Sequence, residues 1–480
     1  MNETVFDQKL NTLLKFDILD KQTVNKFSEI IKSLDKWDLF RINPLKFAQI
    51  YNFDTNFIID IFVHSVKIGL FDFSWNLICP ACGGIEHSVT NLNNIKGETF
   101  HCSTCDIDVS MEIDDQVEVA FTINSSIKDL QINPYVDLNN FINYYFSKNY
   151  IQAKELRDYR EKSMIGFFIV QPDEDAIIIT ETQPNSMYRF ISIEAHSNFY
   201  IYTDNKQAEL PQIVEIDLLN NGFSPNKINI QSGKTKVYIH NRGKSIMSIL
   251  AFKIEEGIYE IIKNNPNEKI NFLTGKMLLN NQSFRELFRI QSLSKDLKLN
   301  VRSLTIMFTD LKGSTEMYEK AGDIRAYNLV QHHFKILSDS VRKHSGAIVK
   351  TMGDAIMATF SNPKDGLLSA IDMMNNIKNI NEEWLKEGQQ EVGLKIGLNE
   401  GSALVVNADE RLDYFGQSVN IAARVQGLAA ANEIWLTESI YNSNKIKDII
   451  EENDYNYEKQ QALLKGVGNS VIVYKCYNTD

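Results

Sequence analysis

The last third of the chain alternates strand-like and helix-like segments, and this alternation restricts it to a small set of mixed α/β folds. Apolar and β-branched runs predict strands, whereas apolar residues at three- and four-residue spacing predict helices. The strand-like segments are 301–309, the hairpin 347–360, and 392–401. The helix-like segments lie near 314–322, 323–344 and 364–387. We therefore expect a sheet that helices cover on one face.

Two carboxylates stand where strands of this sheet are expected to end. The stretch FTDLKGST, 308–315, puts Asp310 at the end of the first strand, before a glycine, a serine and a threonine at the mouth of a helix. The tip of the hairpin puts Asp354 next to Gly353. If the hairpin lies beside the first strand, the two carboxylates converge. Together with substrate phosphates, they are an adequate cradle for one or two Mg²⁺ ions.

Three motifs, in this order and spacing, resemble the catalytic domain of class III adenylyl/guanylyl cyclases. They are FTDLKGST at 308–315, KTMGDAIMATF at 350–360 and DYFGQSVNIAARV at 413–425. The resemblance covers roughly residues 300–475, and we expect the catalytic domain to span residues 300–480. It implies a ferredoxin-like domain that acts as a homodimer, with active sites at the subunit interface.

The resemblance also implies which residues bind metal. Asp310 and Asp354 would hold two Mg²⁺ or Mn²⁺ ions in each active site, and the carbonyl group of Leu311 would be an additional ligand. By itself, an aspartate at the end of a strand is usually a turn or capping residue. The joint occurrence of the motifs favours the metal site.

A second set of residues falls on the nucleotide-binding positions of the family. Lys350 and Asp413 would select the base, Asn420 would orient the ribose, and Arg424 would stabilise charge on the α-phosphoryl group. Lys465, in LKGVGNS, would reach the terminal phosphates. Adenine offers an acceptor at N1 and a donor at its amine, which match a lysine and an aspartate, whereas guanine presents the reverse pattern. A mismatch leaves buried polar groups unpaired at a cost of about 1–3 kcal/mol each.

We therefore expect an adenylate cyclase that converts ATP to 3′,5′-cyclic AMP and pyrophosphate, with regulatory N-terminal domains. In-line attack of the ribose 3′-hydroxyl on the α-phosphorus requires no protein nucleophile. All six main positions occur in this chain, so a homodimer would contain two complete sites. The alternatives are a guanylate cyclase, or a regulatory scaffold or nucleic-acid-binding signalling protein with a degenerate cyclase domain.

Four of the five cysteines form two CxxC pairs, Cys79 with Cys82 and Cys102 with Cys105, and nineteen residues lie between the pairs. This spacing predicts a zinc ribbon, whose four thiolates hold a structural Zn²⁺ with no open position for catalysis. The amino terminus lacks the apolar core of a signal peptide, so we expect a cytoplasmic protein whose cysteines bind metal rather than form disulfides.

The rest of the chain divides into units of different periodicity. We expect a helical, winged-helix-like segment at 1–75, the zinc ribbon at 76–125, a helical connector at 126–162, a cupredoxin-like β-sandwich at 163–260 and a helical linker at 261–299. No cysteine lies between 106 and 475, which excludes a blue-copper site of the His/Cys type in the sandwich. The N-terminal half is also similar to uncharacterised regions that precede some bacterial cyclase domains.

The charge of the chain argues against nucleic acid and membrane partners. The formal net charge is -12, and residues 1–120 carry ten Lys and Arg against eighteen Asp and Glu. Such a surface repels a phosphate backbone. The most apolar stretch, Phe57–Leu70, is interrupted by Asp60, His64 and Lys67, so we expect no membrane span.

Overall fold

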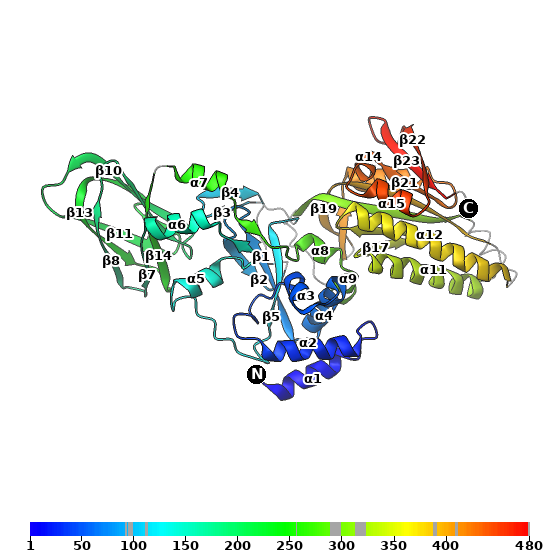
Figure 1. Ribbon diagram of the computed structural model, residues 1–480, viewed down its shortest axis with the longest axis horizontal. Helices are drawn as coiled ribbons and strands as arrows, with labels where there is room; N and C mark the ends of the chain where they lie inside the picture. Colours follow the sequence, from blue (N-terminus) through cyan, green and yellow to red (C-terminus); the bar gives the residue numbers. More distant parts are fainter. Residues whose placement is uncertain are drawn as a thin grey trace.

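A computed structural model of the protein describes residues 1–91, 94, 99–110, 114–255, 257–288, 299–312, 323–386, 391–408 and 411–478. The molecule is elongated, with a β-sandwich at one end, the N-terminal helices and the cysteine-containing segment in the middle, and the C-terminal α/β unit at the other end (Figure 1). The helix expected near 314–322 lies outside the described residues. Among the described helices, none has the length and apolarity needed to span a membrane.

The N-terminal unit begins with four helices. They are α1 (Glu3–Leu13), α2 (Lys21–Ser33), α3 (Pro44–Tyr51) and α4 (Thr55–Lys67). The side chains of Asn43 and Asp54 accept hydrogen bonds from the first turns of α3 and α4 and cap these helices. These caps are local features, so the sequence alone predicts them.

A small antiparallel sheet follows the helices and shares their core. β1 (Phe71–Ile78) lies between β2 (Ile85–Val89) and β5 (Val117–Ile123), while β3 (Thr99–Cys102) and β4 (Ile107–Ser110) form a separate hairpin. The Phe62 ring of α4 packs on Phe71 and Phe121, with ring centroids 5.3 and 4.8 Å apart. The boundary expected between residues 75 and 76 therefore falls inside β1, within one continuous core.

The connector and the sandwich come next. The connector contains α5 (Leu138–Tyr145), β6 (Tyr150–Ile151) and α6 (Lys154–Ser163). The sandwich contains β7 (Met164–Val170), β8 (Asp175–Thr182), β9 (Met187–Ser192), β10 (Ser197–Gln207), β11 (Gln212–Leu219), β12 (Gly222–Ser224), β13 (Lys227–Asn241) and β14 (Met247–Ile254). The long β13 pairs in parallel with β10 through its first half and with β11 through its second half. It thereby joins two layers around one apolar core.

A linker leads from the sandwich back to the C-terminal unit. It consists of α7 (Ile258–Asn264), β15 (Glu268–Lys269), α8 (Gly275–Leu279) and α9 (Gln282–Leu287). β15 pairs with β6, and α9 packs between α4 and β17 of the C-terminal unit. The apolar side of α9 packs inward, since Phe284 is fully buried against Phe73 and Trp75.

The C-terminal unit has the expected sheet, but helices lie on both of its faces and not on one face only. Its strands are β16 (Leu299–Lys312), β17 (Ala347–Met352), β18 (Ala355–Phe360), β19 (Gly393–Ala408), β20 (Arg411–Phe415), β21 (Glu433–Thr437), β22 (Asn456–Ala462) and β23 (Val471–Tyr477). Its helices are α11 (Asp323–Lys343), α12 (Pro363–Lys386), α13 (Gln417–Gln426), α14 (Glu438–Tyr441) and α15 (Ile446–Glu452). The strand order is β17-β18-β16-β19-β21-β23-β22, with β20 paired to β19.

The two faces of this sheet have different covers. α11 and α12 lie side by side on one face (Figure 1), where Met307 and Leu311 of β16 join their core. α13 lies on the other face, directly over β19. A Cβ atom at Gly397 would come within 2.1 Å of the Gln426 backbone nitrogen, so only glycine permits this approach. Ile306 and Phe308 also point to that face and continue the core of the N-terminal unit.

Candidate active site and metal centre

The two predicted metal-binding carboxylates lie at the same end of two neighbouring strands, β16 and β18, of the C-terminal sheet. β16 pairs with β18 in antiparallel register up to Phe308 opposite Met357. Continued by two residues, this register puts Asp310 level with Ala355, next to Asp354. The backbone N–H of Ile356 donates to Thr309 Oγ1 at 3.3 Å and fixes the hairpin to β16. The condition stated for convergence, a hairpin beside the first strand, is therefore met.

Asp310 also has a partner that the sequence motifs did not identify. Lys395 lies opposite it on β19, with Nζ 3.2 Å from Asp310 Oδ2. A lysine in the apolar first part of the strand-like segment 392–401 was the available signal. The Leu311 side chain is buried among the helices, so its carbonyl oxygen is the group it can offer to an ion. The cation of Lys395 currently balances the charge of Asp310.

A buried histidine lies behind the hairpin. His333 of α11 is 1% exposed, and burial lowers its pKa to about 4, although the nearby Asp354 charge opposes the shift. The imidazole is therefore neutral at physiological pH. It leaves the negative charge of Asp354 available to a metal ion.

The two predicted base-selecting residues meet within the chain. Lys350 of β17 and Asp413 of β20 are 63 residues apart in the sequence, and Lys350 Nζ lies 2.7 Å from Asp413 Oδ2. The Tyr414 backbone N–H donates to the other carboxylate oxygen at 2.8 Å. The structure thus presents one donor and one acceptor side by side, which is the pattern that adenine requires.

The predicted ribose and phosphate residues point away from their own sheet. Asn420 and Arg424 are exposed and lie one turn apart on α13, whereas Ala422 and Val425 of the same helix are buried against the sheet. Lys465 is exposed in the loop between β22 and β23. Within the part of the chain that the structure describes, no ion pair joins these cations to Asp310 or Asp354.

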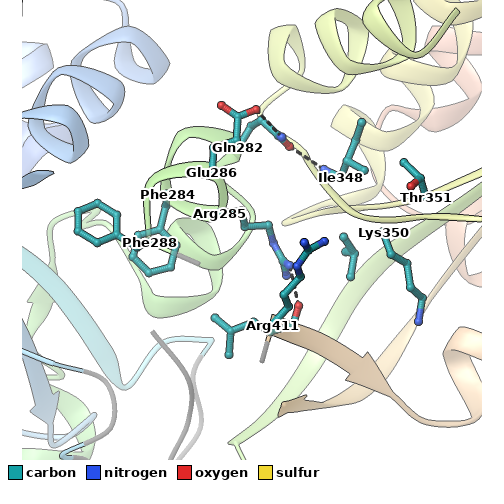
Figure 2. Close-up of a pocket in the computed structure, with 11 residues that line it drawn as sticks. Gln282, Phe284, Arg285, Glu286, Phe288, Ile348, Lys350, Thr351 and Arg411 are labelled. Atoms are coloured by element: carbon teal, nitrogen blue, oxygen red, sulfur yellow. Dashed lines mark hydrogen bonds between the residues drawn. The ribbon is translucent and has the colours of Figure 1, made fainter. Parts of the chain in front are cut away.

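The last helix of the N-terminal region supports both strands that carry the base-selecting pair. Gln282 Oε1 of α9 accepts a 2.8 Å hydrogen bond from the Ile348 N–H, two residues before Lys350. Arg285 Nη1 donates to the Leu412 carbonyl at 2.9 Å, one residue before Asp413. Figure 2 shows Arg285 and Lys350 around the same cavity, which has a volume of about 200 Å³. This role of Arg285 was not predictable from the sequence, because it depends on how distant segments pack.

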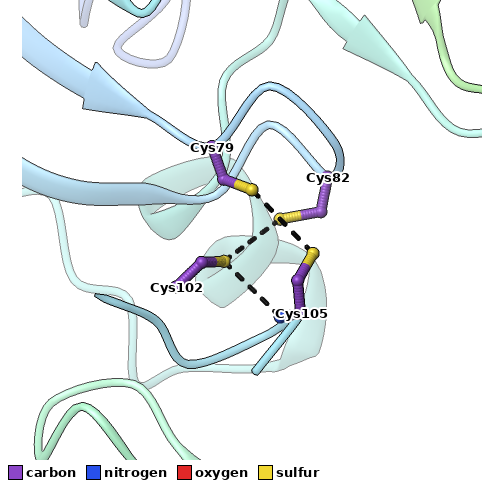
Figure 3. A group of neighbouring side chains, drawn as sticks. All are labelled: Cys79, Cys82, Cys102 and Cys105. Carbon is purple, nitrogen blue, oxygen red and sulfur yellow. Dashed lines mark hydrogen bonds between the residues drawn. The ribbon is translucent and has the colours of Figure 1, made fainter. Parts of the chain in front are cut away.

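The four paired cysteines converge on one point (Figure 3). Their sulfur atoms all lie within 4.8 Å of one another, with Cys79 to Cys105 at 3.9 Å and Cys82 to Cys102 at 3.6 Å. A tetrahedral zinc site with Zn–S bonds of about 2.3 Å has sulfur–sulfur distances of about 3.8 Å. A disulfide would need about 2.05 Å. The geometry therefore fits a metal ion held by four sulfurs.

The pKa values of the cysteine thiols in this cluster also favour a bound metal cation. Hydrogen bonds from Cys102, Cys105 and Cys82 lower the pKa of the Cys79 thiol, so one thiolate is favoured. Hydrogen bonds with Cys102, Cys105 and Cys79 raise the pKa of Cys82, and hydrogen bonds with Cys105 and Cys79 raise the pKa of Cys102, so these two thiols keep their protons. Four thiolates can coexist here when a metal ion compensates their charge.

Two protein families match the chain. The one described as "Family of unknown function (DUF5939)" matches residues 5–286, and the "Adenylate and Guanylate cyclase catalytic domain" matches residues 298–475. The first description names no fold, so the winged-helix expectation stays a prediction.

Several cyclases are similar to the C-terminal region. The adenylate cyclase of Anabaena cylindrica is 30% identical over 153 residues, which are 29% of this chain and 30% of that protein. The adenylate cyclase of Lachancea kluyveri is 28% identical over 190 residues, or 35% of this chain and 10% of that protein. The chain thus spans about a third or less of the length of these curated relatives.

Solved structures match the same region. The adenylyl cyclase CyaB from P. aeruginosa is 25% identical with a TM-score of 0.34, covering 38% of this chain and 97% of that one. The guanylyl cyclase Cya2 is 21% identical with a TM-score of 0.33, covering 38% of this chain and 95% of that one. Residues 5–286 make the chain a member of the DUF5939 family, and at residues 298–475 it carries a catalytic domain of the adenylate and guanylate cyclase family.

Proposed function

We propose that the protein is an adenylate cyclase that forms cyclic AMP and pyrophosphate from ATP at the interface of a homodimer. The observation that carries the proposal is the Lys350–Asp413 pair, in which Nζ and Oδ2 are 2.7 Å apart. An adenine base accepts from the lysine at N1 and donates its amine to the aspartate, so it replaces the present ion pair without leaving either group unpaired.

Asp310 and Asp354 would hold two Mg²⁺ or Mn²⁺ ions, with the Leu311 carbonyl as a further ligand. Their position at one edge of the sheet and their hard oxygen donors fit these metals. When bound, the ions lower the pKa of the ribose 3′-hydroxyl and hold the triphosphate. Lys395 balances the charge of Asp310 until metal and nucleotide arrive.

The remaining residues bind the substrate and stabilise the transition state. Asn420 orients the ribose so that its 3′-hydroxyl is in line with the α-phosphorus. Arg424 donates to the α-phosphoryl oxygens, where negative charge develops. Lys465 contacts the terminal phosphates, which leave as pyrophosphate.

A second copy of the chain completes each site. Asn420 and Arg424 are exposed on the side of α13 that faces away from their own sheet, so they are available to a nucleotide held by another molecule. In a two-fold symmetric pair, the carboxylates of one subunit meet α13 of the other, and the reverse arrangement forms a second site. A single subunit is then inactive.

The N-terminal domains regulate this site through α9. Gln282 and Arg285 of α9 hold the backbones beside Lys350 and Asp413, so a shift of α9 moves both residues together. The four cysteines of the N-terminal unit hold a structural Zn²⁺ that keeps its knuckles folded. Reduced thiolates and an ATP substrate favour a cytoplasmic location.

The test is turnover by the purified full chain with Mn²⁺ and either ATP or GTP. We expect cyclic AMP from ATP and much less cyclic GMP from GTP. Asp354→Asn removes a metal ligand worth about 4 kcal/mol in the transition state, and lowers the rate about a thousandfold. Asp339→Asn, on the exposed side of α11, is the matched control and leaves the rate unchanged. A folded dimer that turns over neither nucleotide would indicate a scaffold, and a preference for GTP would indicate a guanylate cyclase.

A further inference from the structure

A cavity of about 160 Å³ lies where the first cysteine knuckle, the connector and the β-sandwich meet. Its walls come from the N-terminal half of the chain, so it is separate from the cyclase site. Gly83 lets the knuckle lie against the Tyr150 ring, because a Cβ atom there would be 2.5 Å from Tyr150 Cγ. An apolar cavity of about 150 Å³ is large enough for benzene. The space thus suits a ligand with one small ring or a short chain.

Most of the cavity wall is apolar. Phe141 of α5 is fully buried, and Ile191 and Leu250 of the sandwich are 4% and 7% exposed. Met164 and Phe252 extend this wall. Such a wall favours a hydrocarbon or aromatic body over water, because each buried apolar surface gains from losing its hydration.

Three polar atoms on the opposite wall lack a partner. Tyr150 Oη, Gln152 Oε1 and Asn267 Oδ1 are buried, and no hydrogen bond reaches any of them from the described residues. The Asn267 amide nitrogen donates to the Ala81 carbonyl at 2.9 Å, which fixes its oxygen as the free acceptor. An unpaired buried polar atom costs about 1–3 kcal/mol. A ligand with a hydroxyl or N–H group would satisfy one of the two acceptors.

Arg160 supplies a positive charge to the same cavity. It lies on α6, and its guanidinium makes no hydrogen bond or ion pair within the described ranges. Burial lowers its pKa, which shows that the charge is partly removed from water. A carboxylate would compensate this charge with two parallel hydrogen bonds.

We propose that this cavity is a binding site for a small organic carboxylate that has an apolar body of about one ring and one hydroxyl or N–H group. The carboxylate pairs with Arg160 and accepts a hydrogen bond from the Tyr150 hydroxyl. The apolar body lies against Phe141 and Leu250, and the donor reaches Gln152 or Asn267. Neither an uncharged molecule nor a simple inorganic anion uses all three parts of the cavity.

The test uses the full-length, zinc-loaded protein and calorimetric titration with 4-hydroxybenzoate. We expect saturable binding of 4-hydroxybenzoate. We expect 4-hydroxybenzyl alcohol, which lacks the carboxylate, to bind at least about tenfold more weakly than 4-hydroxybenzoate. Arg160→Met loses about tenfold or more in affinity for 4-hydroxybenzoate. Arg157→Met, one turn earlier on the exposed side of α6, is the matched control and binds like the wild type.

Tyr150→Phe provides a second test in case Arg160→Met does not fold. It removes an unpaired buried hydroxyl, so the ligand-free protein keeps or raises its melting temperature, whereas the affinity for 4-hydroxybenzoate falls. A purely structural role of the hydroxyl would lower the melting temperature instead. The proposal is overturned if the wild type does not bind 4-hydroxybenzoate at millimolar concentration, or if Arg160→Met binds it as tightly as the wild type.

Discussion

The shared active site makes a quantitative prediction for mixed dimers of two inactive variants. Asp310→Ala removes a carboxylate at the sheet edge, and Arg424→Ala removes an exposed cation of α13. Neither change touches the buried side of α13, so both variants should fold and dimerise. Each variant alone lacks one essential group in both of its sites and should be inactive.

A heterodimer of the two variants restores one site. One of its sites combines the Asp310→Ala and Arg424→Ala defects, whereas the other receives an intact carboxylate pair from one subunit and an intact Arg424 from the other. Random mixing in equal amounts makes about half of the dimers heterodimers, and each has one of two sites, so about a quarter of wild-type activity returns. Heterodimers purified through two different tags should reach about half.

A control with the same two substitutions on one chain separates the models. The double variant Asp310→Ala/Arg424→Ala, paired with a wild-type subunit, leaves one defect in each site and should be inactive. If each chain instead contained its own complete site, this pair would keep about half of the activity and the first pair would have none. Cyclic AMP formation by the two tag-purified heterodimers therefore gives opposite results for the two geometries, and activity of the second pair alone would refute the shared site.

Two further predictions concern the N-terminal half. Arg285→Met removes the hydrogen bond to the Leu412 carbonyl beside Asp413. We expect the KM for ATP to rise about tenfold with a smaller effect on kcat, because a charged hydrogen bond is worth about 1.5–3 kcal/mol. Steady-state kinetics at saturating Mn²⁺ check this, and an unchanged KM counts against control through α9. Cys105→Ser should reduce the zinc content of the purified protein from one ion per chain to none and lower its melting temperature. The control variant Cys476→Ser, in the C-terminal core, should keep the zinc. Elemental analysis distinguishes the two variants, and full zinc content in Cys105→Ser would contradict the four-sulfur site.

The C-terminal architecture was predictable because its central strand is a continuous apolar run and its long helices have regular apolar faces. The periodicity of β16 and α12 follows directly from which residues contact the core. The positions of the two carboxylates at strand ends could be predicted from the sequence for the same reason. In contrast, the contact of Lys350 with Asp413 depends on how β17 and β20 approach each other, and only the resemblance to a family indicated it.

Features that depend on packing between distant segments were not predictable. β1 appeared to divide a helical unit from a ribbon, but it pairs along its length with β5, which begins at Val117, and this places both units in one core. Lys395 and Arg285 look like ordinary surface charges until the strand or loop beside them is known. The proposed cavity combines residues of four predicted units, so no one of them contained a sign of it.

The segment from Asn267 to Gln282 connects the proposed cavity with the base-selecting residues, and it is held rigidly along its length. β15 pairs with β6 beside Tyr150, the Asn271 carbonyl accepts from Asn43 Nδ2 at 2.8 Å, and the Leu273 carbonyl accepts from the Val119 N–H at 2.8 Å. α8 and α9 follow directly. These hydrogen bonds tie the segment to the same core as β5 and Asn43. If the proposed regulation through α9 operates, we therefore expect a displacement at the cavity wall to reach α9 together with this core, and not through the linker alone.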